Sequence, residues 1–248
     1  MSWRIRKSVI GTTVLDKLHV YTTVWNEAYM IKYFMRWYDT VADRIFVMDD
    51  NSDDGTREIV ASYPKATLLP CDTSGFDEYK KTNRLGTEYR KHSRDAEWVI
   101  TCDCDEFVYN PDLRNFLTQK RDVGFRAIRT RGVFFASKEI PETDGQLFDA
   151  MPYKWYLNSY NKPIVFDPKL DVEFGPGCHP PAKFSEGVEA GGCGLYLYHC
   201  CYLSKQWIID HLEKRISRMT DPYYKDMYQK KSGNFLRKAF AVYDAYVK

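Results

Sequence analysis

Two carboxylates, Asp103 and Asp105, lie two residues apart directly after the apolar run Trp98–Ile100. A short apolar run of this kind is typical of a buried strand. Carboxylates at the end of a strand can hold a hard divalent cation, since Mg²⁺ usually takes one or two protein carboxylates together with phosphate oxygens. The spacing therefore predicts a site for Mg²⁺ or Mn²⁺ that bridges to a nucleotide diphosphate. A solvated turn after the strand is the alternative.

The first half of the chain alternates between strand and helix patterns. Such alternation predicts βαβ units and a parallel sheet, in which ligands bind outside the carboxyl ends of the strands. Polar residues follow three of the predicted strands, at 25–27, 49–52 and 103–105, so we expect these segments to line one crevice. The predicted elements are strands at 18–25, 44–48, 66–69 and 98–100, and helices at 27–38, 56–63 and 77–91.

The second half of the chain has a different character. Residues 123–135 alternate like half-buried strands, and 167–194 hold several Gly and Pro residues, as in a long functional loop. A short strand is expected at 194–200, a helix at 204–219 and, after an interruption at Pro222, a last helix at 235–246. We therefore expect one domain over residues 1–202 and a helical extension packed on it over 203–248.

Composition describes an ordinary globular protein of 248 residues with a net charge of only +2. A net charge this small gives no overall positive field of the kind that would indicate binding to nucleic acid. No apolar run reaches the ~18 residues needed to span a membrane. Because the N-terminal apolar patch is also too short for a signal peptide, a cytoplasmic protein is expected. The seven cysteines, an odd number, are interpreted as reduced thiols. The alternative is a zinc cluster formed by Cys178, His179, Cys193, His199 and Cys200.

Three motifs occur in an order and spacing that resemble the family 2 glycosyltransferases of the GT-A fold. Residues 23–27 (Thr-Val-Trp-Asn-Glu) are similar to the family's Thr-x-Tyr-Asn-Glu strand end, and residues 47–56 to its Val-Asp-Asp-Gly-Ser-x-Asp-Gly-Thr motif. Residues 103–107 (Asp-Cys-Asp-Glu-Phe) resemble its Asp-x-Asp motif with the Glu-Phe tail of one bacterial subgroup. The resemblance implies a GT-A, Rossmann-like α/β fold with a mostly parallel sheet flanked by helices. It also implies transfer of a sugar from a nucleotide diphosphate, most simply a UDP-sugar, with Mn²⁺ or Mg²⁺ and with inversion.

The resemblance assigns roles to single residues, each with a structural alternative such as a helix cap, a core aromatic or a solvated charge. The pyrimidine base is expected at Asp50, Thr23 and Trp25, the ribose at Glu27 and Asp103, the diphosphate at Lys81, and the metal at Asp103, Asp105 and His199.

An inverting transfer needs a general base that deprotonates the acceptor hydroxyl. Glu173 is the first candidate because it lies just before a Gly-rich loop, and Asp171 is the second; no motif selects between them and Glu186. The acceptor itself stays open between a glycan, a lipid-linked sugar, a protein and a modified nucleic acid. A nonenzymatic carbohydrate- or nucleotide-binding protein and a nucleotidyltransferase are the alternative functions.

Overall fold

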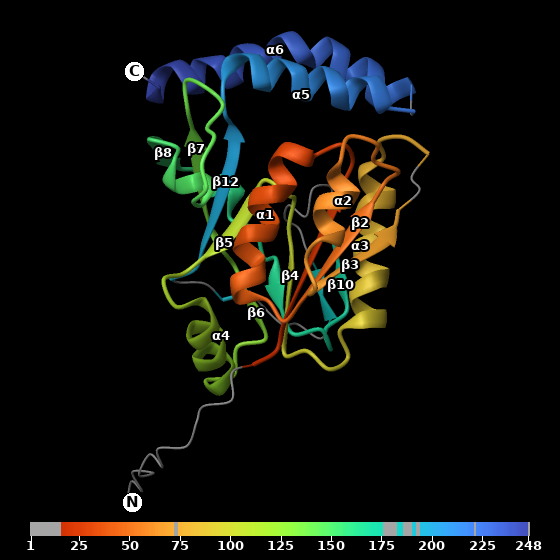
Figure 1. Ribbon diagram of the computed structural model, residues 1–248, viewed down its shortest axis with the longest axis vertical. Helices are drawn as coiled ribbons and strands as arrows, with labels where there is room; N and C mark the ends of the chain where they lie inside the picture. Colours follow the sequence, from red (N-terminus) through yellow and green to blue (C-terminus); the bar gives the residue numbers. More distant parts are fainter. Residues whose placement is uncertain are drawn as a thin grey trace, which may run out of the picture.

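The computed structural model describes residues 16–71, 74–175, 183–185, 190–191, 194–220 and 222–247 (Figure 1). Its larger sheet has six strands. In order across the sheet these are β3 (Ala66–Pro70), β2 (Arg44–Asp49), β1 (Leu18–Val24), β4 (Trp98–Thr101), β9 (Val165–Phe166) and β6 (Ala127–Ile128). The first four run parallel, and β9 is antiparallel to both β4 and β6. The expected mostly parallel α/β sheet is therefore confirmed.

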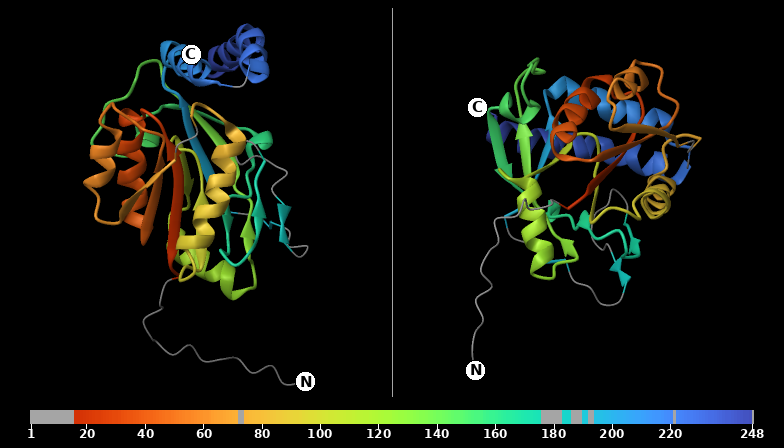
Figure 2. Two further views of the ribbon diagram at one scale, coloured as in Figure 1. Left: turned by 90° about the vertical axis from the view of Figure 1, so that its right-hand side faces the viewer. Right: turned by 60° about the horizontal axis from the view of Figure 1, so that its bottom comes forward.

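Helices cover both faces of this sheet. Figure 2 shows α1 (Ala28–Val41) and α2 (Thr56–Ala61) on one face and α3 (Glu78–His92) on the other. This arrangement follows from right-handed crossovers, because the chain moves outward from β1 to β3 and then returns to place β4 on the other side of β1. Covered on both faces, β1, β2 and β4 are buried nearly throughout, which explains their apolar sequences.

A second sheet of four strands lies beside the first. In order it contains β5 (Glu106–Tyr109), β12 (Tyr196–Tyr202), β7 (Arg131–Ala136) and β8 (Tyr153–Tyr156). β12 runs antiparallel to β5 and parallel to β7. The acidic segment 102–105 connects β4 to β5, so it crosses from one sheet to the other. The smaller elements are α4 (Leu113–Asp122), β10 (Val172–Glu173) and β11 (Lys183–Phe184).

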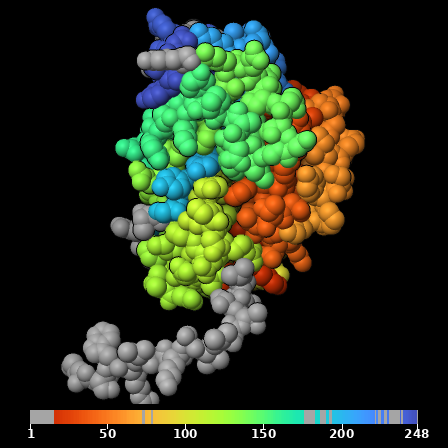
Figure 3. All heavy atoms as spheres, turned by 60° about the vertical axis from the view of Figure 1, so that its left-hand side comes forward, coloured from red at the N-terminus to blue at the C-terminus, as the bar shows by residue number. Residues whose placement is uncertain are grey.

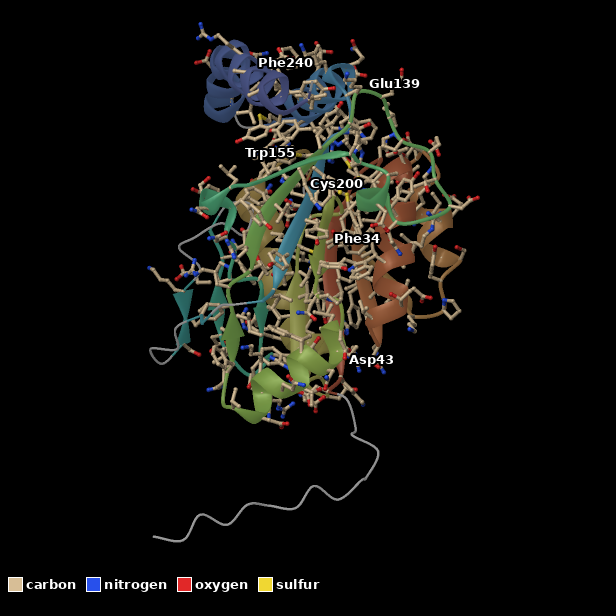
Figure 4. All side chains as sticks on the ribbon, turned by 90° about the vertical axis from the view of Figure 1, so that its left-hand side faces the viewer. Phe34, Asp43, Glu139, Trp155, Cys200 and Phe240 are labelled. Carbon is tan, nitrogen blue, oxygen red and sulfur yellow. The ribbon has the colours of Figure 1, made fainter. Side chains whose placement is uncertain are left out.

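Two helices complete the chain, α5 (Lys205–Arg218) and α6 (Pro222–Tyr246). Ser204 begins α5 as its N-cap, where its Oγ accepts a hydrogen bond of 3.1 Å from the backbone N–H of Trp207. Figure 4 labels Asp43, just before β2, at the end of the molecule opposite to these helices. The helices therefore lie at the carboxyl ends of the parallel strands. In Figure 3 they pack against the green segment that contains β7 and β8.

The structure corrects the start of the last helix and adds several elements that the sequence did not predict. α6 begins at Pro222 rather than at 235, because proline is well accepted in the first turn of a helix, where its missing N–H needs no partner. The elements that were not predicted are α4, β5, β8, β9, β10 and β11. No helix in the described part of the chain is both long and apolar enough to cross a bilayer. The predicted division at residue 202 stays a prediction.

Candidate active site

Three neighbouring parallel strands end side by side. β1 pairs with β2 on one side and with β4 on the other, in registers that set Val24 opposite Asp49 and Tyr21 opposite Thr101. The backbone continues these ladders past the strand ends, since Asp50 N donates to Val24 O at 3.0 Å and Cys102 N to Tyr21 O at 3.1 Å. The three polar segments predicted to share one edge of the sheet therefore follow adjacent strands.

The loops after β1 and β2 are bound to each other. Asn26 and Asn51 have positive φ values of 50° and 62°, a conformation that asparagine tolerates better than most residues. The turn at Asn26 lets its backbone N–H donate to Ser52 Oγ at 2.8 Å and its side-chain amide donate to Asp53 at 2.7 Å. These contacts fix the position of Asp50 relative to Trp25, which follows β1.

Asp103 is paired with a lysine from α3. Lys81 Nζ donates to Asp103 Oδ1 at 2.6 Å, and both side chains are partly exposed. Burial opposes the charge on Asp103, but Lys81 and Lys162 more than offset this effect and hold the pKa of Asp103 well below its ordinary value. An ionised carboxylate beside a cation therefore lies at the carboxyl end of β4.

Asp105 contacts His199 of β12. His199 Nε2 lies 3.1 Å from Asp105 Oδ2, and Cys200 N donates to Asp105 O at 2.9 Å. Burial disfavours both charges, but the contact with His199 lowers the pKa of Asp105, and the Asp105 carboxylate raises the pKa of His199. His199 Nδ1 is buried and has no hydrogen-bond partner among the described residues. The predicted grouping of Asp105 with His199 is thus present in the structure.

A buried ion pair lies directly beneath the acidic segment. Lys162 and Glu106 are both fully buried, and Lys162 Nζ donates to Glu106 Oε1 at 2.6 Å. The same oxygen accepts from Tyr160 OH at 2.6 Å, while Glu106 Oε2 accepts from Asp103 N at 3.2 Å. The Tyr160 ring stacks on His199 with centroids 4.5 Å apart. This network holds the 103–106 turn and the His199 imidazole in fixed positions.

Sequence reasoning gave Lys162 and Glu106 no role. The available signal was a lysine at the start of the apolar run 162–166, where a charge needs a buried partner. No pattern in the sequence identifies that partner as Glu106, which is 56 positions away.

Asp50 and Trp25 both contact α5. Arg218 Nη2 donates to Asp50 Oδ2 at 2.5 Å, and the Arg218 guanidinium carbon lies 4.0 Å from the centroid of the Trp25 ring. Lys214 lies 5.3 Å from the same centroid and donates to Asn26 O. The two residues expected to recognise a pyrimidine base are therefore close together, and a cation from α5 contacts both.

The remaining residues expected at the nucleoside lie at the same strand end. Glu27 Oε1 contacts His211 Nε2 of α5 at 3.0 Å, and it lies 3.8 Å from Lys214 Nζ. Thr23 is half-buried near the end of β1, opposite Met48 in the β1–β2 ladder. Trp25, Glu27 and Asp50 therefore all contact α5, and Thr23 lies two residues before Trp25 near the end of β1.

The two carboxylates expected to act as general base lie elsewhere. Asp171 contacts Arg90 Nε at 2.9 Å, and Glu173 lies 4.0 Å from Lys183 Nζ; both carboxylates are largely exposed. Arg90 is nine residues beyond Lys81 on α3, about 13 Å along the helix axis. Among the described residues, no hydrogen bond or ion pair connects either carboxylate to the acidic segment. Glu186, Cys178, His179 and Cys193 lie outside the described residues.

The donors at Asp105 and His199 fit a divalent cation. Carboxylate oxygens suit Mg²⁺ and Mn²⁺, and imidazole is a common metal ligand in its neutral form, so His199 would lose its proton to the solvent when it binds the ion. In the described part of the chain, no group of three or more His, Cys, Asp or Glu side chains is arranged to hold an ion. A cation here would therefore complete its shell with phosphate oxygens and water, as Mg²⁺ often does. Cys102, Cys104, Cys200 and Cys201 nearby are free.

Comparison with known proteins gives distant structural likenesses. No protein-family model matches the sequence, and no curated protein matches it either. Mannosyl-3-phosphoglycerate synthase from Rubrobacter xylanophilus is similar with a TM-score of 0.36 and 16% identity over 52% of this chain and 43% of that chain. S. aureus TarS is similar with a TM-score of 0.42 and 12% identity over 86% of this chain and 42% of that chain.

The name of a third similar protein contains a diphosphocytidyl group rather than a sugar. It is 4-diphosphocytidyl-2C-methyl-D-erythritol synthase from Anaerococcus prevotii, with a TM-score of 0.38 and 14% identity over 62% of this chain and 72% of that chain. Because the TM-scores and identities are this low, the comparisons do not assign an activity, which is inferred from the residues of this chain. The chain also spans less than half of the synthase from Rubrobacter xylanophilus and of TarS.

Proposed function

We propose that the chain is a metal-dependent glycosyltransferase that moves a sugar from a nucleotide diphosphate, most simply a UDP-sugar, to an acceptor hydroxyl. The observation that carries the proposal is that Asp50 follows β2 while Asp103 and Asp105 follow β4, the two parallel strands on either side of β1, with Lys81 beside Asp103. A base-recognising carboxylate, a lysine and a pair of metal-binding carboxylates are the groups that a nucleotide diphosphate with a cation requires.

The nucleoside would bind at the end of β1 and β2. Trp25 offers a flat ring for stacking, and Asp50 offers an acceptor for the N–H of a pyrimidine base. Glu27 and Trp25 share Lys214 as a neighbour, and Glu27 would accept from a ribose hydroxyl. The diphosphate would then extend toward Lys81, since that cation already lies beside the acidic segment.

The transfer chemistry depends on stabilising the leaving diphosphate. A cation held by Asp105 and His199, with Asp103 beside it, would supply Lewis-acid stabilisation of that charge. Lys81 and Lys162 keep Asp103 ionised, and protonated His199 does so for Asp105. Binding of the cation would therefore displace the proton of His199, since imidazole binds a metal only in its neutral form. Inversion also needs a base for the acceptor hydroxyl. The sequence predicts Glu173 or Asp171 for this role, and either would have to leave its surface ion pair to act.

The proposal is tested with a panel of nucleotide sugars and Mn²⁺, measuring release of the nucleoside diphosphate with and without acceptor mixtures. We expect release from a UDP-sugar and its loss in Asp105→Ala. The control is Asp122→Ala, because Asp122 is exposed at the end of α4, at the opposite end of the sheet (Figure 1). Circular dichroism checks that both variants fold.

The outcomes separate the alternative functions. Undiminished release by Asp105→Ala contradicts the metal-dependent mechanism. Metal-dependent UDP binding without release from any sugar would instead indicate a nonenzymatic nucleotide-binding protein.

A further inference from the structure

α5 lies across the carboxyl ends of the parallel strands (Figure 1). One face of the helix contacts the loops after β1 and β2 through His211, Lys214 and Arg218. Arg215, the residue after Lys214, contributes to lowering the pKa of Asp103. The helix thus covers the edge of the sheet at which the nucleotide is proposed to bind.

Arg218 makes the two contacts proposed for the base. Its guanidinium group lies over Trp25, with its central carbon 4.0 Å from the ring centroid, and it donates to Asp50 at 2.5 Å. A guanidinium group is planar and carries N–H donors at its edge. A pyrimidine base that stacks on Trp25 and donates to Asp50 presents the same features, so both cannot occupy the position at once.

The end of α5 is held by a second, independent contact. Phe76, in the loop between β3 and α3, donates its backbone N–H to Arg218 O at 2.8 Å and pairs with Met219. Gly75 has a φ of +126°, and a Cβ there would lie 2.6 Å from Arg218 O and would also collide with the Thr220 side chain. The loop can therefore approach the helix end only because residue 75 is glycine.

From these contacts we propose that α5 is a displaceable cover, and that Arg218 occupies the base position until a nucleotide replaces it. This inference rests on the proposed function. His211, Lys214 and Arg218 hold the strand-end loops through polar contacts, which water or phosphate oxygens can replace. Ile208, Leu212 and Met219 are buried and also hold the helix, which keeps the closed state the major one. After α5 has moved, its basic side chains Lys214 and Arg218 would still lie near the bound diphosphate and could interact with its negative charge. A nucleotide must then bind the minor, open state, and its apparent Kd is raised by the fraction of closed molecules.

Two substitutions open the cover in different ways. Arg218→Ala removes the occupant of the base position, whereas Gly75→Ala displaces the end of α5 without changing a residue of the nucleotide site. Gly124→Ala is the matched control for backbone strain, because Gly124 also has a positive φ, +91°, but a Cβ added there would meet nothing within 4 Å. Isothermal titration with UDP and Mn²⁺, and with uridine alone, measures the affinities.

If the closed state is about ten times as populated as the open state, opening the cover strengthens binding about tenfold. We expect a gain of this order for UDP and for uridine in both opened variants, and no gain in Gly124→Ala. Weaker or unchanged uridine binding in Arg218→Ala would overturn the cover while leaving the proposed function intact. Absence of UDP binding in the parent protein and in every variant would overturn both.

Hydrogen exchange gives a measurement on the parent protein, independent of how the variants fold. With UDP and Mn²⁺ present, we expect faster amide exchange in residues 205–218, because the contacts of α5 are released. Slower exchange in this helix at saturating UDP would show that the nucleotide binds beneath a closed α5, and would overturn the proposal.

Discussion

Replacing Lys162 by methionine removes the cation from a fully enclosed ion pair. The Lys162 side chain is 1% exposed and that of Glu106 is 0% exposed. Methionine keeps the length and apolar character of the lysine stem. The substitution leaves the Glu106 carboxylate buried with only Tyr160 OH and Asp103 N as donors. The expected result is a large loss of stability.

The magnitude follows from the burial of both partners. Removing one member of a buried pair costs about 3–5 kcal/mol, since the remaining charge has lost its compensation. In a chain of this size each kcal/mol lowers the Tm by about 2–4 °C, so Lys162→Met should lower it by about 6–20 °C. Adding Glu106→Gln removes the unpaired charge while keeping an acceptor for Tyr160, and should restore at least half of the loss.

Urea unfolding followed by circular dichroism measures these free energies, with Lys169→Met as control. Lys169 lies in the same part of the chain but is exposed, so its replacement should change the stability by less than about 0.5 kcal/mol. A loss below about 1 kcal/mol in Lys162→Met would refute the reasoning. So would a double variant less stable than Lys162→Met alone.

Three further predictions concern single carboxylates. Asp105→Asn should weaken Mn²⁺-dependent UDP binding at least about tenfold in titration calorimetry, since the substitution removes a charged ligand; unchanged affinity would contradict its role. Either Glu173→Gln or Asp171→Asn should lower the transfer rate by about 10²–10⁴-fold, as loss of a general base does; rates within about threefold of the parent in both variants would contradict the role of these carboxylates as the base. Asp43 is partly buried, but bonds from Leu18 N and Arg114 hold its pKa below the ordinary 3.8. Its contribution to stability is therefore present above that pH and lost as the pH falls through the lowered pKa, so Asp43→Asn should flatten the acid dependence of urea unfolding; an unchanged slope would contradict this.

The strand ends were accessible from the sequence because local signals mark them. An apolar run followed by polar residues identifies the ends of β1, β2 and β4, and the βαβ alternation implies that parallel strands end at one edge. Asp50, Asp103 and Asp105 could therefore be grouped in advance. The sequence pattern could not tell which strand ends are neighbours. The structure shows that β1 lies between β2 and β4.

Contacts between distant parts of the chain were less accessible. The helix at 204–219 was predicted, but its basic residues suit a solvated face as well as a covered site, and only tertiary packing sets Arg218 on Asp50, 168 positions away. β8 was missed because it is four residues long and its two buried or half-buried positions give little periodicity. The general base was not predictable because no motif distinguishes one carboxylate from another in the loop-rich second half.

The central claim is that a cation and a nucleotide diphosphate bind together at the carboxyl ends of β1, β2 and β4. Crystals grown with Mn²⁺ and UDP, recorded near the manganese absorption edge, test it directly. We expect an anomalous peak beside Asp105 and His199, with the uracil ring on Trp25 and within hydrogen-bond distance of Asp50. A manganese peak away from Asp105, or a nucleotide bound elsewhere on the molecule, would contradict it.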